Sequence, residues 1–393
     1  MNLHNKTGLY LICIKVLFLF SGCDSKTDVD KNRQEQTLHF DVSNWEEKQA
    51  IPRKIIKSIK FTPLETTDSS LIGSIGKMYK LDGFLYVKDN QYVKEILIYN
   101  HNGKYERSIG KYGRGAGEFI DLTDFLIDEK QNHLLILDNQ QRKVLTYNLV
   151  NGDHINDLKI QFWATNFSNP EDHVLSFYSK DQDLAGPKHL IANLDLIENS
   201  KEWFLEQDQY DKHFSYRHSI FQSENTYFAP YFKDVVYRIT KDKVEPFITF
   251  NFCKDKIPKE KLQNKERLRE IQEVLDEKNW TYGIENVIEN EHFLTFNFKL
   301  RNQNVIVIYC KESGNYVYGN HFEGGLGAFP LIKYITVSEN EFIGVIDAFL
   351  FCRMKQMVME QGNEELKNQY LETLNTVSEE SNPIIVSIQY NTF

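Results

Sequence analysis

The chain contains an internal repeat, and this feature constrains its fold more than any other. Residues Leu81–Gly103 and Glu129–Gly152 each hold an apolar run, a polar Asp-Asn-Gln break, a second apolar run and a turn that ends in glycine. The Asp-Asn-Gln triplets are offset by 49 residues and the Tyr-Asn pairs that follow them by 48. This pattern predicts strand, turn, strand and turn. A period of about 40–50 residues with four strands in each unit is typical of a β-propeller blade.

Later copies of the repeat are degenerate but keep two strand-like runs around a polar break. They cover Tyr227–Ile239, His292–Tyr309 and Ile332–Val345. We divide the length of the folded part of the chain, without two helical segments, by a period of about 48 residues. This gives six to seven blades. We therefore predict an all-β fold, a six-bladed β-propeller with seven blades as the alternative count.

Two segments have helical rather than strand periodicity. Residues 258–279 place Leu262, Leu268, Ile271 and Leu275 on one face among dense charges, and residues 357–374 repeat an apolar position every four residues. Neither is long enough for a coiled coil. We expect both insertions to pack on one face of the propeller as a lid or buttress.

A ring of blades needs closing, because propellers leave only short, protected edges. The last apolar run, Ile384–Tyr390, is the natural partner for a strand from the start of the chain. Two segments could supply that strand: Thr37–Val42 or Ile55–Pro63. We predict that one of them joins the same blade as Ile384–Tyr390.

Composition supports a folded, strand-rich protein and limits its partners. The chain has 27 Phe, 21 Tyr and 4 Trp, and aromatic residues favour half-buried pleated surfaces. Its 46 basic and 56 acidic residues give a net charge of −10. Non-specific nucleic-acid binding needs a basic surface, so we expect no nucleic-acid partner.

The N-terminus predicts export. Lys6 precedes a mostly apolar stretch, Gly8–Phe20, and Ser21 and Gly22 then lead to Cys23. Such a stretch is too short to cross a bilayer but suits a signal peptide. Small residues before a cysteine resemble a bacterial lipobox, in which Cys23 becomes the lipidated first residue; an ordinary signal with an incidental cysteine is the alternative.

The predicted domain organisation follows from this cleavage. Residues 1–22 form the signal peptide, and residues 23–36 are polar and predict a flexible tether. Residues 37–393 then form a single propeller domain. The expected location is the cell envelope, at the outer membrane, with the lipid at Cys23 as the membrane anchor.

Several segments of the mature chain resemble the six-bladed β-propeller lipoproteins of Bacteroidota, a group of largely uncharacterised function related to NHL-repeat propellers. Phe61–Thr66 followed by Leu71-Ile72-Gly73 is similar to the family's opening signature, and Arg107–Phe119 is similar to its glycine-rich loop between blades. Asp124–Asp128, Val235–Ile239, Gly324–Pro330 and Asn382–Val386 are similar to later elements. The resemblance implies the fold and the location, and implies no reaction.

Motifs for catalysis or metal binding are missing from the sequence. Three cysteines of the mature chain, Cys253, Cys310 and Cys352, have no disulfide or metal spacing, so we expect thiols on strands that pack as small apolar groups. The eleven histidines form no HExxH motif, and there is no GxSxG motif. We predict no cofactor and no metal.

The glycine-rich loop and the repeated aspartates have structural and functional interpretations. Gly110, Gly113, Gly115 and Gly117 match neither phosphate-binding pattern, and positive backbone φ angles in a tight loop explain them better. Asp89 and Asp138 could face an ion in the channel, but capping of a turn fits their repetition better.

Candidate binding residues come from the loops expected near one face of the propeller. Aromatic, Arg and His residues cluster at Gln161–Trp163, Phe214–His218 and Trp280–Tyr282, and most of these rings should belong to the core. The polar candidates for a channel mouth are Arg114, Glu118, Asp121 and Arg217.

Three functions remain open. The leading hypothesis is a membrane-anchored binding module for a glycan, a peptide or a partner protein. The alternative is a hydrolase or lyase of the propeller type with carboxylates, and Ca²⁺, at the channel mouth; three or more ligand side chains within metal reach would favour it. The third is a scaffold subunit of an outer-membrane assembly, which would expose an apolar patch on a blade edge or on the helical insertions.

Overall fold

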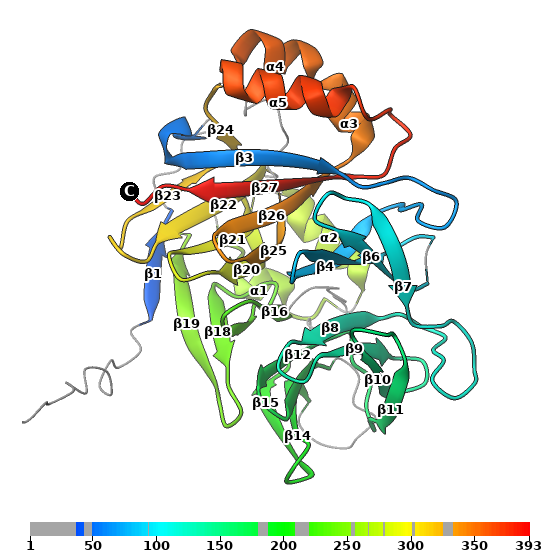
Figure 1. Ribbon diagram of the computed structural model, residues 1–393. Helices are drawn as coiled ribbons and strands as arrows, with labels where there is room; N and C mark the ends of the chain where they lie inside the picture. The colour runs from blue at the N-terminus through cyan, green and yellow to red at the C-terminus, as the bar shows by residue number, and fades with distance from the viewer. Residues whose placement is uncertain are drawn as a thin grey trace, which may run out of the picture. The chain divides into compact units, whose positions relative to one another are not determined.

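The computed structural model describes residues 37–393 apart from 43–48, 93, 180–187, 209–219, 253–255, 266, 278–279, 301–302 and 325–332. Six small sheets follow one another around a ring (Figure 1). This arrangement confirms the all-β, six-bladed β-propeller and excludes the seven-bladed count. The signal peptide, the tether and Cys23 lie outside the described residues.

Each blade is an antiparallel sheet whose first strand lies innermost, against the first strands of its neighbours. Blade 1 comprises β4 (Ile75–Leu81), β5 (Phe84–Asp89), β6 (Ile96–Asn100) and β7 (Tyr105–Ile109). Blade 2 comprises β8 (Asp124–Asp128), β9 (His133–Asp138), β10 (Lys143–Asn148) and β11 (His154–Lys159). Blade 3 comprises β12 (Asn166–Glu171), β13 (Val174–Tyr178), β14 (His189–Asp195) and β15 (Ser200–Glu206).

The remaining blades follow the same order, and the last takes a strand from near the N-terminus. Blade 4 comprises β16 (Ile220–Gln222), β17 (Thr226–Phe228), β18 (Val235–Ile239) and β19 (Val244–Asn251). Blade 5 comprises β20 (Thr281–Glu289), β21 (Phe293–Leu300), β22 (Gln303–Cys310) and β23 (Tyr316–Gly319). Blade 6 comprises β25 (Tyr334–Ser338), β26 (Glu341–Ile346), β27 (Ile384–Tyr390) and β3 (Ile56–Pro63).

The ring closes where β27 pairs antiparallel with β3, as one of the two predicted pairings required. The other pairing is wrong, because β1 (Leu38–Asp41) runs parallel to β19 as a fifth strand of blade 4. Phe40 of β1 is 2% exposed and packs edge-on against Phe296, which explains why this segment belongs between blades 4 and 5. The strand β2 (Ala50–Ile51), which lies between β1 and β3 in the chain, forms a short parallel pair with β24 (His321–Phe322).

The repeated residues perform the same structural task in blades 1 and 2. The hydroxyl of Tyr99 donates to the carbonyl of Ser70 at 2.9 Å, and that of Tyr147 donates to the carbonyl of Gly117 at 2.9 Å. The repeat therefore ties the third strand of each blade to the chain that enters the blade. Burial explains why the residue is an aromatic with a polar tip: both rings are at most 2% exposed and both hydroxyls have a partner.

Asp89 and Asp138 cap the turns that follow them, as their repetition predicted, because they accept from the N–H groups of Tyr92 and Gln141, three residues further on. Asp89 accepts hydrogen bonds from the backbone N–H groups of Gly73 and Ser74, at 3.0 and 2.8 Å. Asp138 accepts from the N–H of Ile120 at 2.8 Å. Both carboxylates thus fix the segment that leads into the inner strand.

The first helical insertion contains α1 (Lys259–Leu262) and α2 (Leu268–Glu277). Ile271, Val274 and Leu275 of this insertion are buried against Trp280, and Tyr231 packs on the same cluster. Because Tyr231 also lines the central channel, this insertion borders one end of the channel.

The second insertion is longer than expected, with α3 (Ala348–Arg353), α4 (Lys355–Gln361) and α5 (Glu364–Leu374). Residues 348–353 were not predicted as helix because this short apolar segment shows no helical period. The expectation that it covers a face of the propeller is wrong, since α5 packs on β3, the outermost strand of blade 6 (Figure 1). Phe351 anchors it, with ring centroids 5.2 Å from Phe61.

The cysteine prediction is confirmed for Cys310, which is a buried free thiol on β22. Cys352 is also a free thiol, but it lies on α3 rather than on a strand. Cys253 lies outside the described residues.

Candidate functional site

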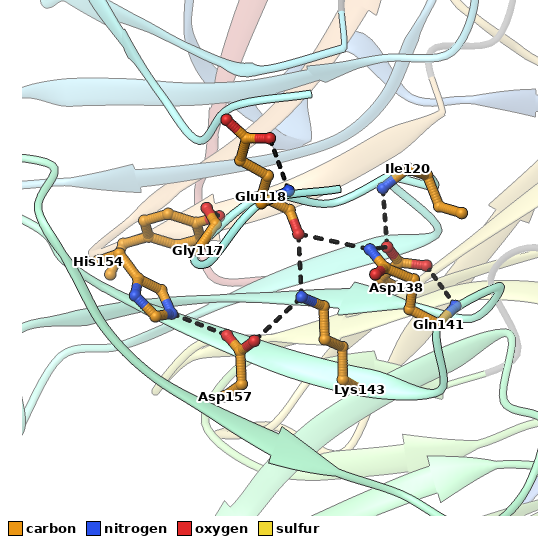
Figure 2. Close-up of polar contacts among 10 residues, drawn as sticks. Gly117, Glu118, Ile120, Asp138, Gln141, Lys143, His154 and Asp157 are labelled. Atoms are coloured by element: carbon orange, nitrogen blue, oxygen red, sulfur yellow. Dashed lines mark hydrogen bonds and ion pairs between the residues drawn. The ribbon is translucent and has the colours of Figure 1, made fainter. Parts of the chain in front are cut away.

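The glycine-rich loop connects β7 to β8 and folds back on itself through Glu118 (Figure 2). The Glu118 carboxylate accepts from the N–H of Gly115 at 2.8 Å and pairs with Lys111 at 2.8 Å. The side-chain hydrogen bond from Lys111 and the N–H of Gly115 hold the pKa of Glu118 below its ordinary value. A Cβ on Gly113 would lie 2.0 Å from this carboxylate, so a side chain at this position would displace Glu118 from its contacts in the loop. Glu118 is therefore occupied within its own loop.

Backbone conformation explains the glycines at the two ends of the loop. Gly110 and Gly117 have φ angles of +99° and +68°, where glycine is strongly favoured. A Cβ on Gly117 would lie 2.5 Å from the ring of His154. The predicted positive φ angles are confirmed for Gly110 and Gly117 and are wrong for Gly113 and Gly115, where the absence of a Cβ leaves room for the Glu118 carboxylate instead.

Below the loop, a polar network joins the chain entering blade 2 to its outer strands (Figure 2). The Lys143 ammonium donates to the carbonyl of Glu118 at 2.9 Å and contacts the Asp157 carboxylate at 3.0 Å. His154 Nε2 lies 2.7 Å from the same carboxylate. Burial alone would raise the pKa of Asp157, but the hydrogen bonds from Lys143 and His154 lower it below the ordinary value. All four residues act within the scaffold of blade 2.

The remaining predicted site residues are Arg114, Asp121 and Arg217. Arg114 is exposed at the tip of the loop, and Asp121 accepts from the hydroxyl of Thr123 at 2.6 Å. Arg217 lies outside the described residues. The two cavities at the ends of the central channel are lined by none of Arg114, Glu118 or Asp121, so the candidate site is built from other residues.

The first cavity, of about 350 Å³, lies where inner strands β4, β16, β20 and β25 begin; we call it the amphipathic mouth. It combines aromatic and aliphatic walls with hydrogen-bonding groups from four blades. Its lining includes Lys77, Tyr79, Asn90, Ile220, Phe221, Tyr231, Glu285, Asn286, Lys333 and Ile335. Cavities with this mixture bind small organic ligands, because apolar walls supply affinity and a few polar groups fix orientation.

One wall of the amphipathic mouth contains a buried ion pair. The Lys77 ammonium lies 3.0 Å from both carboxylate oxygens of Asp124, whose side chain is 2% exposed. Burial opposes the charged ammonium, yet the carboxylate of Asp124 holds the pKa of Lys77 above its ordinary value. Asp124 also accepts from the N–H groups of Phe125 and Phe167. This pair links blades 1, 2 and 3 and fixes the position of Lys77.

A second pair at this mouth is accessible. Lys333 lies 2.8 Å from Glu285, and their side chains are 47% and 32% exposed. Tyr231 lines the same mouth, and its ring centroid lies 4.9 Å from that of Phe232 and 5.6 Å from that of Tyr282. These three lining residues can reach a ligand without breaking the ring of blades.

The predicted aromatic segments divide between core and mouth. Phe162 is buried against Phe177, and Trp280 donates its Nε1–H to the carbonyl of Val274 at 2.9 Å. Tyr282 packs on Tyr231 and so supports the mouth from behind. The Phe214–His218 segment lies outside the described residues.

The second cavity, of about 580 Å³, lies where the inner strands end, and we call it the acidic mouth. The two cavities share Tyr79, Gln222 and Thr336. Eight carboxylates line the second cavity: Asp82, Asp128, Glu129, Glu171, Asp172, Glu224, Glu289 and Glu339. Among the described residues, no three His, Cys, Asp or Glu side chains converge closely enough to hold a metal ion.

An apolar patch is exposed on the second helical insertion. Phe349, Leu350, Met357 and Met359 of α3 and α4 are 37–43% exposed. The scaffold hypothesis requires a patch of this kind, and nothing in the structure shows what covers it. Within the part of the chain that the structure describes, no helix is both long and apolar enough to cross a membrane.

Sequence reasoning missed both mouths. Lys77, Glu285 and Lys333 carry no motif, and Tyr231 lies at the turn between β17 and β18. The available signal was the position of a residue within its repeat, because the first strand of every blade lines the channel. Because the later repeats are degenerate, the position of a residue within its blade could not be assigned from the sequence there.

Comparisons with known proteins agree with the fold. An exported protein of Bacteroides fragilis is similar in structure, with 19% sequence identity, a TM-score of 0.71, and coverage of 91% of this chain and all of the other. A member of the DUF4221 family from Bacteroides vulgatus has 9% identity and a TM-score of 0.52, with 86% of this chain and 97% of the other covered. None of the curated proteins matches the chain in sequence. The model of the family described as "Domain of unknown function (DUF4934)" matches residues 38–389, so the chain belongs to that family.

Proposed function

We propose that the protein is a lipid-anchored propeller of the bacterial cell envelope that binds a glycan or a peptide at the amphipathic mouth. The observation that carries the binding role is the cavity itself: four blades contribute aromatic rings, ammonium groups and amides to one opening of about 350 Å³. Rings with nearby cations and amides suit sugar faces and peptide side chains. The anchor and the outer-membrane location rest on the lipobox at Cys23 and on the resemblance to Bacteroidota lipoproteins. The description of the B. fragilis neighbour as exported supports export.

Binding is tested by screening residues 24–393 against glycan and peptide arrays, followed by titration of each hit. Tyr231→Ala and Lys333→Ala should each weaken binding of a true ligand about tenfold, since each removes one contact group at the mouth. Lys355→Ala is the matched control, because it removes an exposed lysine on α4, away from the channel. Uniform silence on both arrays, or equal losses in the control, would contradict the proposed binding.

The anchor is tested separately in a bacterial host that acylates lipoproteins. The chain should incorporate labelled palmitate and appear in the outer-membrane fraction, whereas Cys23→Ser should do neither. An unlabelled wild-type chain would refute the anchor and leave the binding result intact.

A further inference from the structure

The strand β20 of blade 5 is irregular where it lines the amphipathic mouth. Its pairing with β21 breaks register twice, between Tyr282 and Glu285 and between Glu285 and Ile288. Asn286 lies in the second break and has a φ of +53°. Most non-glycine residues with a positive φ in the described part of the chain lie in turns, whereas Asn286 lies inside a strand. Bulges redirect side chains, and left-handed residues inside regular structure gather at functional sites.

The amide group of Asn286 is the property that needs an explanation. The side chain is partly exposed and lines the cavity. Among the described residues, its amide makes no hydrogen bond to the protein. Asparagine tolerates a positive φ better than most residues, but glycine does so without steric cost. Backbone conformation alone therefore does not account for a hydrogen-bonding side chain at this position.

Tyr231 lines the same mouth from blade 4, and its ring is held in place by β20. The N–H of Gly283 donates to the carbonyl of Tyr231 at 3.0 Å. Gly283 has a φ of +70°, and a Cβ there would lie 2.9 Å from Cε2 of Tyr231, so the backbone of β20 lies against the ring. Phe232 and Tyr282 pack edge-on against the same ring. The first register break therefore positions an aromatic ring at the mouth, and the second positions an amide.

The charged groups that line this mouth are already paired within the protein. Lys77 pairs with Asp124 at 3.0 Å, and Lys333 pairs with Glu285 at 2.8 Å. Among the described residues, the lining contains no other Asp, Glu, Lys or Arg. Its uncharged polar side chains are amides and hydroxyls: Asn90, Gln222, Asn286, Thr336 and the two tyrosines Tyr79 and Tyr231. A ligand thus meets rings and hydrogen-bonding groups but no unpaired charge.

This combination fits an uncharged sugar ring. The C–H face of a pyranose packs on an aromatic ring, and sugar hydroxyls donate and accept hydrogen bonds, as an amide does. A charged sugar or a charged peptide would bring a charge without a partner next to apolar walls, which is costly. An apolar peptide side chain would use the ring but would leave the amide of Asn286 without a partner.

We propose that the amphipathic mouth binds an uncharged pyranose unit of a glycan, with one C–H face on the ring of Tyr231 and hydroxyl groups on the amide of Asn286. This inference rests on the proposed binding function and selects the class of its ligand. The ion pair of Lys333 and Glu285 stays closed and offers its outer atoms to further hydroxyl groups.

The ligand class is tested by calorimetric titration of residues 24–393 with defined probes. These are neutral tetrasaccharides of glucose, mannose, galactose and xylose, a tetramer of galacturonic acid, and an octapeptide of alternating Leu and Ser. At least one neutral tetrasaccharide should bind, and more tightly than the acidic sugar or the peptide. Saturation-transfer NMR of that sugar should show its strongest signals on the C–H protons of one ring face, as stacking on Tyr231 requires.

Asn286→Gly tests the amide without straining the backbone. It should weaken the sugar about fivefold to tenfold through the lost hydrogen bonds. The melting temperature should stay equal or rise, because glycine adopts the positive φ freely. The matched control is Asn199→Gly, the same exchange at a φ of +50° in the turn between β14 and β15, where the residue lines neither mouth. It should change binding less than about twofold.

The ring is tested by a pair of variants at Tyr231. Tyr231→Phe keeps the stacking surface and should hold binding within about threefold, whereas Tyr231→Leu should weaken it about tenfold. Equal losses in these two variants would contradict stacking. An unchanged affinity of Asn286→Gly, or an equal loss in Asn199→Gly, would contradict the contact with the amide.

The probes also separate this inference from the proposed binding function. Binding of the peptide or of the acidic sugar in place of the neutral sugars, with a loss in Tyr231→Ala and Lys333→Ala, would overturn the ligand class and leave the proposed function intact. Silence of every probe here and on both arrays would overturn both.

Discussion

Lys77 of blade 1 and Asp124 of blade 2 form a buried ion pair that holds three neighbouring inner strands at one wall of the channel. Both carboxylate oxygens lie 3.0 Å from the ammonium, and the same carboxylate accepts an N–H from blade 3. Removing one partner leaves the other charge uncompensated. Lys77→Met should therefore lower the free energy of unfolding by about 3–5 kcal/mol, measured by urea denaturation.

The double variant Lys77→Met, Asp124→Asn provides the comparison for this prediction. Asparagine removes the charge and keeps an oxygen for one of the two backbone N–H groups, which bond to different oxygens of Asp124. The double variant should therefore be more stable than Lys77→Met alone, which leaves a buried charge without its partner. Equal stability of the two would mean that the ion pair contributes nothing beyond the packing of the lysine stem.

The pairing of β27 with β3 predicts a large loss on truncation. Deleting residues after Asn382 removes the third strand of blade 6, including Ile384 and Ile388, which are fully buried. The melting temperature should fall sharply, because the ring then opens between its first and last elements. Deleting residues 37–42 removes only an edge strand of blade 4 and should lower it less. An unchanged melt of the C-terminal truncation would contradict closure through β27.

Gly117 should be more sensitive to substitution than a glycine with the same backbone conformation in open space. Gly117→Ala meets both a positive φ and the ring of His154, and should cost about 2–4 kcal/mol in unfolding free energy. Gly83 has a φ of +79° but no atom within 4 Å of a Cβ, so Gly83→Ala should cost about 1 kcal/mol. Thermal or urea unfolding of both variants measures the difference, and equal costs would show that the contact with His154 is relieved easily.

The Asp195–Lys241 pair predicts a specific pH window. The Lys241 ammonium lies 2.7 Å from Asp195, and this contact, with the N–H of Glu198, lowers the pKa of Asp195 from 3.8 to about 2. A carboxyl group whose pKa is lower in the folded state stabilises the protein above its unfolded pKa. That contribution is lost as the pH falls from 3.8 towards 2.

Unfolding free energies of wild type and Asp195→Asn, measured from pH 6 to pH 2, check this window. The difference between them should be constant above about pH 4 and shrink below it. A difference that stays constant down to pH 2 would exclude a role for the ionised carboxylate. Asp153→Asn is the control, because Asp153 is exposed and lies at the corresponding connection between the third and fourth strands of blade 2.

The repeat made part of the structure predictable from sequence. Asp89 and Asp138, with Tyr99 and Tyr147, recur because blades 1 and 2 use the same hydrogen bonds to fix the segment that enters the blade. Gly110 and Gly117, at the two ends of the glycine-rich loop, were predictable for a similar reason, since a positive φ angle is a local requirement. The helices of residues 348–361 were less predictable from sequence. They depend on the packing of Phe351 against Phe61, and the sequence shows no helical period there.

The candidate site was not predictable to the same degree. Arg114, Glu118 and Asp121 were chosen for charge near a loop, yet Glu118 is used by its own loop. Lys77 and Lys333 carry no motif and meet at one mouth only because blades 1 and 6 are neighbours in the closed ring. Likewise, Asp82, Glu129 and Glu339 of the acidic mouth look like ordinary turn residues until the blades are placed around the axis.

The sequence by itself determined the blade, because turn caps, buried aromatics and positive-φ glycines are local and repeat with the blade. Only the tertiary structure decided which strand closes the ring and which side chains face the channel. Ile59 and Ile388 pair from opposite ends of the chain, and no local pattern distinguished β3 from β1 as the partner. The physical reason is that closure and the two mouths depend on contacts between blades, which form only when all six are assembled.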